Sequence, residues 1–108
     1  MHQYELDEVE RRRAASGRDY LEFLRFPQMS AGLYKLAAGA ADKQKPHNED
    51  EMYYVVHGRA MIHVGGDDQP VQPGTAVFVP AQVEHRFHSI TEDLTLLVVF
   101  APAEGARA

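Results

Sequence analysis

The sequence predicts an all-β fold, a sandwich or a barrel, preceded by one short helix. After residue 20 the chain divides into seven or eight short segments of alternating or continuous apolar residues. The stretches between them, such as GAADKQ, GGDD, QPG and TED, are rich in residues that favour turns. No second helical pattern interrupts this series. Many short strands at such spacing are typical of a β-sandwich or barrel.

A short helix is predicted for residues 8–15. Asp7 stands where an N-cap residue is expected, Glu10 follows in the capping-box position, and Gly17 is a stop signal. A chain of 108 residues suffices for one compact domain. We therefore expect a helix and lead-in over residues 1–19, a single barrel domain over 20–102, and a tail over 103–108 that frays.

The strands are predicted in order from residue 20 onward. The first spans residues 20–26, where two interleaved sets of side chains alternate and Pro27 marks the boundary. The turn-rich stretches then delimit the others. These remaining predicted strands are 31–37, 52–56, 59–64, 69–71, 75–79, 84–89 and 94–100.

Composition and charge argue against several classes of function. The chain has no cysteine, so only His, Asp and Glu remain as strong metal ligands. Its formal net charge of -5 argues against nucleic-acid binding, which depends on Lys and Arg. No apolar run approaches the roughly 20 residues of a membrane span, and the N-terminus lacks an apolar signal core. We expect a cytoplasmic protein with neither a nucleic-acid nor a membrane partner.

Two stretches carry candidate metal ligands. In residues 43–58, KQKPHNEDEMYYVVHG, a histidine and several carboxylates lie directly before a strand. On a straight strand the Cα atoms of His47 and Glu51 would be roughly 13 Å apart, so a shared ion requires the chain to bend between them. In residues 74–89, GTAVFVPAQVEHRFHS, His85 continues a row of apolar residues and is expected to face inward, although Pro80 could shift that register through a bulge.

These two stretches resemble the paired motifs of the cupin superfamily, in particular those of small single-domain microbial cupins. The resemblance covers residues 31–100. Three positions depart from the motifs: Lys45 replaces a histidine, Gln82 a turn glycine and Ser89 an asparagine. The residues that match the first motif are Gly39, His47, Glu51 and Gly58, and those that match the second are Gly74, Pro80 and His85.

The resemblance implies a small double-sheet β-barrel, or jelly roll, that holds a divalent metal through His47, Glu51 and His85. Gln44, through its amide oxygen, or Glu49 could supply a fourth ligand. Two imidazoles and one carboxylate suit Fe, Mn, Co, Ni and Zn alike, so the residues do not select the metal.

Lys45 leaves two alternatives open. If its ammonium points into the pocket, a nearby cation and burial would lower its pKa and make it a usable base. If it points outward, Gln44 or water completes the coordination. We expect the outward orientation, because an uncompensated ammonium beside a metal is costly and the lysine stem can reach solvent.

Two function classes remain open for such a pocket, whose walls are expected to include Tyr53 and Phe87. The first is an enzyme that acts on a small organic molecule by metal-dependent oxygenase, decarboxylase or isomerase chemistry, with Glu49 or Lys45 nearest for proton transfer. The second is a non-catalytic module or sensor that binds a small molecule.

A homodimer is expected whether the protein is an enzyme or a non-catalytic binding module. A single small sheet pair would leave edge strands and outward apolar residues such as Tyr54 and Val56 without cover. Pairing of two identical faces is the commonest way to cover them.

Overall fold

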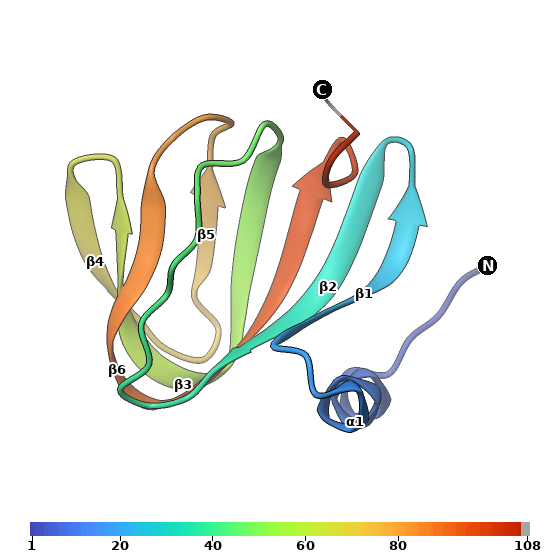
Figure 1. Ribbon diagram of the computed structural model, residues 1–108, viewed down its shortest axis with the longest axis horizontal. Helices are drawn as coiled ribbons and strands as arrows, with labels where there is room; N and C mark the ends of the chain where they lie inside the picture. The colour runs from blue at the N-terminus through green and yellow to red at the C-terminus, as the bar shows by residue number, and fades with distance from the viewer. Residues whose placement is uncertain (107–108) are drawn as a thin grey trace.

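The computed structural model describes residues 1–106 and shows a mostly antiparallel β fold with one N-terminal helix (Figure 1). The predicted fold class is thereby confirmed. In chain order the elements are α1 (Leu6–Ser16), β1 (Tyr20–Phe26), β2 (Met29–Leu36), β3 (Asp50–Val64), β4 (Asp67–Val71), β5 (Ala76–Val79) and β6 (His85–Ala101).

Two long strands, β3 and β6, organise the sheet. The strand order is β1-β2-β6-β3-β4, and β5 pairs separately with β3. β5 lies along the first part of β3, from Glu51 to Tyr54, whereas β4 lies along its last part, from Ala60 to Val64. Because β3 and β6 pair with each other through both parts, they join the two halves of the predicted barrel into one curved sheet.

The continuity of β3 differs from the sequence prediction, which placed separate strands at 52–56 and 59–64. The dipeptide His57-Gly58 resembles a turn signal, but here it forms an irregular stretch with three register shifts against β6 between Val55 and Met61. Gly58 has φ +94°, and a Cβ at that position would meet the carbonyl oxygen of Asp93 at 2.3 Å. Bulges of this kind bend a strand without ending it. The predicted strands 84–89 and 94–100 likewise merge into β6.

The core fills the interior of the curved sheet with inward side chains from its central strands. Tyr53 and Phe87 pack edge to face, with ring centroids 4.9 Å apart. His85 and Phe87 are both buried, as the predicted alternation in this segment requires. The buried cluster comprises Leu36, Tyr53, Val55, Ala60, Ile62, Val71, Val79, Phe87, Ile90, Leu94, Leu96, Val98 and Phe100.

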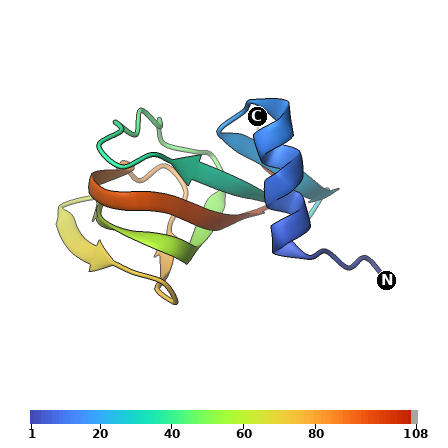
Figure 2. The same cartoon turned by 90° about the horizontal axis from the view of Figure 1, so that it is seen from below.

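The helix α1 packs outside the sheet on β1 and β2 (Figure 2). It begins earlier than predicted: Glu5, not Asp7, is the N-cap residue, and it makes no side-chain capping bond. Glu10 makes no capping bond either, because its two carboxylate oxygens accept hydrogen bonds of 2.8 Å from Arg13. These charge-assisted bonds occupy both oxygens that a capping bond would use. Gly17 ends the helix with φ +73°, as predicted.

The C-terminal segment is held against the sheet as far as Glu104, contrary to the expectation that it frays. Ala103 is buried and donates its backbone N–H to the Pro27 carbonyl, and the Glu104 backbone N–H donates to the Ser30 hydroxyl at 2.9 Å. The end of the predicted tail, residues 107–108, lies outside the described residues. Within residues 1–106, no helix has the length and apolar character required to cross a membrane.

Candidate metal site

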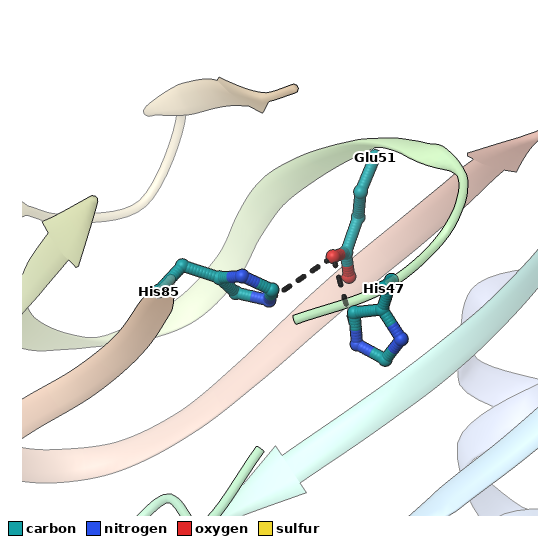
Figure 3. Close-up of side chains that lie close together, drawn as sticks. All are labelled: His47, Glu51 and His85. Carbon is teal, nitrogen blue, oxygen red and sulfur yellow. Dashed lines mark ion pairs between the residues drawn. The ribbon is translucent and has the colours of Figure 1, made fainter. Parts of the chain in front are cut away.

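Three predicted ligands come together at one end of the barrel interior (Figure 3). His47 lies in the connection before β3, Glu51 is the second residue of β3, and His85 is the first residue of β6. Glu51 Oε1 lies 3.2 Å from His85 Nε2 and 3.9 Å from His47 Nε2. One ligand atom from each residue lies within 4.8 Å of the other two.

The chain reaches this arrangement by bending at Asn48 and Glu49, immediately before β3. The loop between β5 and β6 is tied to that bend by two backbone donors. The N–H of Gln82 donates to the His47 carbonyl at 2.7 Å, and the N–H of Ala81 donates to the Asp50 carboxylate at 2.9 Å. These bonds bring the His85 segment beside the His47 segment.

Gln82 shows why the second motif has a glycine at its position. Its φ is +69°, a backbone conformation that side chains other than glycine adopt at a cost. Its side-chain amide donates to the Asn48 side-chain oxygen at 2.6 Å, which offsets part of that cost. The departure from the motif therefore keeps the turn and adds a contact to the His47 loop.

His85 is oriented by a backbone acceptor. Its Nδ1 lies 3.0 Å from the Val83 carbonyl oxygen, so Nδ1 carries a hydrogen and Nε2 faces Glu51. Burial lowers the pKa of His85, but the Glu51 carboxylate and the Val83 carbonyl outweigh burial and the pKa is raised. His85 Nε2 and Glu51 Oε1 are both buried and form an ion-pair contact, but neither atom makes a hydrogen bond among the described residues.

The site opens into a pocket of about 220 Å³. Three tyrosines, two apolar residues of β6 and several polar groups form its walls. No lysine or arginine of residues 1–106 lines it. The lining residues are Tyr20, Tyr34, Gln44, His47, Glu51, Tyr53, Val98, Phe100 and Glu104.

A buried carboxylate, Asp42, fixes the polar wall of this pocket. It accepts hydrogen bonds from the Gln44 amide at 2.8 Å, the Tyr34 hydroxyl at 3.1 Å and the Phe87 backbone N–H at 2.9 Å. Because the Gln44 amide nitrogen is bound to Asp42, its Oε1 turns toward the site, 3.2 Å from His47 Nε2. The same Oε1 accepts the Tyr53 hydroxyl at 3.0 Å. Burial and the Glu51 carboxylate raise the pKa of Tyr53, which keeps this hydroxyl protonated.

Glu104 and Tyr20 form the opposite wall. Glu104 Oε2 lies 3.7 Å from His47 Nδ1. Burial raises the pKa of Glu104, the carboxylates of Glu51 and Glu22 add to this effect, and His47 opposes it. The buried Tyr20 hydroxyl has no hydrogen-bond partner within residues 1–106. Its ring lies so close over Gly32 that a Cβ there would come within 2.2 Å of it.

The other predicted site residues lie elsewhere. Phe87 is buried behind Tyr53 and does not line the pocket. Lys45 is exposed, in agreement with the outward alternative, and is not among the lining residues. Glu49 is buried outside the pocket lining, with one carboxylate oxygen lacking a hydrogen-bond partner in the described chain.

One pair of donor atoms has the spacing expected for two ligands of one divalent ion. Two ligands that bind the same ion at about 2.0–2.2 Å lie roughly 3–3.5 Å apart. The Glu51–His85 contact of 3.2 Å falls in that range, whereas the Glu51–His47 contact of 3.9 Å is longer. The cluster of His47, Glu51 and His85 could therefore hold a metal ion.

Comparison with known proteins agrees with this fold. The chain is 55% identical over 105 residues to the "Uncharacterized protein SCO3923" of Streptomyces coelicolor, covering 97% of this chain and 100% of the relative. The crystal structure of TT1209 from Thermus thermophilus superposes with a TM-score of 0.74 at 28% identity, covering 95% of this chain and 99% of that one.

A second solved structure shows the fold alone. KdgF from Halomonas sp. has a TM-score of 0.70 at 22% identity, covering 81% of this chain and 88% of that one. The family model described as "Cupin domain" matches residues 32–100, which contain both ligand motifs. Because this match spans more than half of the sequence, the chain belongs to the cupin domain family.

Proposed function

We propose that the protein binds one divalent metal ion through His47, Glu51 and His85 and uses it to act on a small organic molecule. The observation that carries the proposal is the buried ion-pair contact of Glu51 Oε1 with His85 Nε2 at 3.2 Å, in which neither atom makes a hydrogen bond within residues 1–106. A divalent cation would take the place of a proton on His85 Nε2 and bind both atoms. Iron, manganese, nickel, cobalt and zinc all suit this donor set.

Gln44 is the best candidate for a fourth ligand. Its amide oxygen lies 3.2 Å from His47 Nε2, a separation that suits two ligands of one ion, and its amide nitrogen is held away from the site by Asp42. The exposed Lys45 therefore leaves the first-histidine position of the motif without a donor, and Gln44 takes its place.

An ion with three or four protein ligands keeps positions open to a small molecule, as oxygenase, decarboxylase or isomerase chemistry requires. The protein supplies the pocket around those positions. The Tyr53 hydroxyl, protonated and hydrogen-bonded to Gln44, is fixed beside the ligands. Val98 and Phe100 supply apolar surface that excludes water from bound substrate.

The pocket favours a small molecule without net negative charge. With a divalent ion present, the charges of the ion and the two lining carboxylates, Glu51 and Glu104, sum to zero. An anionic ligand would add charge to a poorly solvated space that holds no lysine or arginine of residues 1–106. At roughly 30 Å³ per water the volume equals about seven waters, so the ligand has similarly few non-hydrogen atoms.

Metal binding is the first expected result. Protein purified without chelator or added metal is expected to contain about one divalent ion per chain by elemental analysis. After metal removal, a free ion concentration about 100 times Kd should raise the free energy of unfolding by about 2.7 kcal/mol, seen as a higher Tm. If none of the five metals raises the Tm or titrates in calorimetry, the proposal fails.

A turnover assay distinguishes the two function classes, an enzyme and a module that only binds. Neutral molecules with hydroxyl or carbonyl groups that raise the Tm of the metal-loaded protein would then be incubated with it and followed by mass spectrometry. Consumption of the ligand supports the enzyme, whereas unchanged ligand with a saturable Tm shift supports a module that only binds.

We also propose that the protein is a homodimer, paired through an apolar outer face formed by Met52, Tyr54 and Phe78. These residues lie on the paired strands β3 and β5, with Met52 opposite Phe78, and Phe78 is 61% exposed. A second copy would cover this face and the β5 edge.

The Phe78→Glu variant tests the dimer. Light scattering at micromolar concentration should give a dimer mass for the wild type and a monomer mass for the variant, because two carboxylates would be buried unpaired. Phe26→Glu, which changes another exposed aromatic residue on β1, is the control and should remain dimeric. A monomeric wild type would refute the dimer.

A further inference from the structure

We propose that Glu104 is a positioning residue for His47: its carboxylate holds the Nδ1 side of the imidazole so that Nε2 faces the metal. The inference rests on the proposed metal function and adds a residue from beyond both ligand motifs. Its chief observation is the 3.7 Å separation between Glu104 Oε2 and His47 Nδ1, an ion-pair distance. Metal-binding histidines commonly present their second ring nitrogen to a carboxylate or carbonyl in this way.

The two ring nitrogens of His47 have different surroundings. Nε2 makes a hydrogen bond of 3.2 Å with Gln44 Oε1 and lies 3.9 Å from Glu51 Oε1, whereas Nδ1 faces only Glu104 among the ion-pair contacts of the described chain. Because an amide oxygen accepts, Nε2 carries a hydrogen in this contact. Glu104 stands on the side of the ring away from Glu51. An ion would take the place of the Nε2 hydrogen, and the hydrogen then carried by Nδ1 would be attracted to the Glu104 carboxylate.

His85 has the same arrangement with a different acceptor. Its Nδ1 lies 3.0 Å from the Val83 carbonyl, and its Nε2 faces Glu51. Both imidazoles therefore present Nε2 to the same carboxylate oxygen and have an oxygen on the Nδ1 side. For His85 that oxygen is local in sequence, whereas for His47, on an irregular connection, it comes from 57 residues away.

The backbone around Glu104 is built to hold this side chain in place. Ala103 is buried with its N–H on the Pro27 carbonyl, and the Glu104 N–H donates to the hydroxyl of Ser30, which is itself fully buried. Gly105 follows with φ +79°, and the Ala106 N–H closes a turn onto the Ala103 carbonyl. The β1–β2 hairpin thus anchors the segment, and the Glu104 carboxylate projects into the pocket wall.

The test combines metal affinity with the orientation of the His47 ring in the metal-free protein. Wild type, Glu104→Ala and Glu104→Gln would be titrated with Co²⁺ by calorimetry, with Glu92→Gln as a control at an exposed carboxylate on β6. Removing an outer carboxylate partner typically weakens metal binding by about 10-fold or more, so Glu104→Ala should show that loss. Glu104→Gln should recover part of the affinity, because its amide oxygen can still accept from Nδ1–H.

Crystal structures of the metal-free proteins keep the two proposals separate. The His47 ring is expected to keep Nδ1 toward Glu104 in the wild type and to take more than one orientation in Glu104→Ala, whether or not any metal binds. An unchanged ring orientation in Glu104→Ala would overturn the role of Glu104. If the wild type binds Co²⁺, an equal Co²⁺ affinity in Glu104→Ala would overturn that role as well. A wild type that binds no Co²⁺ but shows the change in ring orientation would overturn the proposed metal function alone.

Discussion

Replacing His85 by alanine is expected to abolish metal binding, with the content falling from about one ion per chain to less than about a tenth of that. His85 supplies one of the three donors of the cluster, and its Nε2 lies 3.2 Å from Glu51 Oε1. Without it, the remaining proposed ligands are Gln44, His47 and Glu51, which all lie on one short segment. Ligands from this one segment leave the His85 side of an ion without a protein donor.

Folding must be tested in the same experiment, because His85 is buried. Circular dichroism and the Tm of the metal-free proteins report it. His47→Ala is a second variant with the same expected loss and a smaller risk to the core, since the His47 side chain is 21% exposed in a connection outside the strands. His57→Ala, at an exposed position on β3, is the control that should keep the metal. Full metal content in a folded His85→Ala protein would show that the proposed site is wrong.

The metal cluster could be predicted because its information is local. His47 and Glu51 share one short segment, and the spacing within each motif matches the family pattern. The alternation around His85 predicts its burial, which the structure confirms. A bend between His47 and Glu51 was required by strand geometry, and the structure has it at Asn48 and Glu49.

The residues around the cluster could not be predicted in the same way. Asp42 accepts hydrogen bonds from Gln44, Tyr34 and Phe87, which come from three segments of the chain. The residues next to it in the sequence do not distinguish it from a turn residue. Glu104 stands in a stretch rich in Ala, Gly and Pro, PAEGARA, which has the composition of a flexible chain end. Its place beside His47 follows from the anchoring of Ala103 on Pro27, a contact between distant segments. Pairings that depend on the assembled sheet leave no periodic signal in the sequence.

The sequence predicts where the β segments lie better than it predicts whether two neighbouring segments form one strand. Gly, Asp and Asn mark both true turns and bulges, because each tolerates a backbone that leaves the regular ladder. At Gly65–Gly66 the signal is a turn between β3 and β4, whereas at Gly58 a similar signal lies inside β3. Only the approach of β6 to Gly58 distinguishes the two cases.

Gly58→Ala is expected to lower the free energy of unfolding by about 3 kcal/mol, measured by urea denaturation of the metal-free protein. Two costs combine at this position. A residue with a side chain at φ +94° is strained by about 1–2 kcal/mol. The new Cβ would also meet the Asp93 carbonyl oxygen at 2.3 Å and the Leu94 Cα at 2.8 Å, which are backbone atoms that move only if β6 moves. Such overpacking typically costs about 1–3 kcal/mol.

Gly74→Ala separates the two costs, because Gly74 has the same φ of +94° but a Cβ added there would have no neighbouring atom within 4 Å. It carries the conformational strain alone and should cost about 1 kcal/mol. The difference between the losses of unfolding free energy in the two variants measures the cost of placing a Cβ against β6 at residue 58. Since β6 begins at His85 and pairs with β3 on both sides of Gly58, a shift there should also weaken Co²⁺ binding in Gly58→Ala but not in Gly74→Ala. Equal losses of stability in both variants would show that the close approach of β6 does not restrict residue 58.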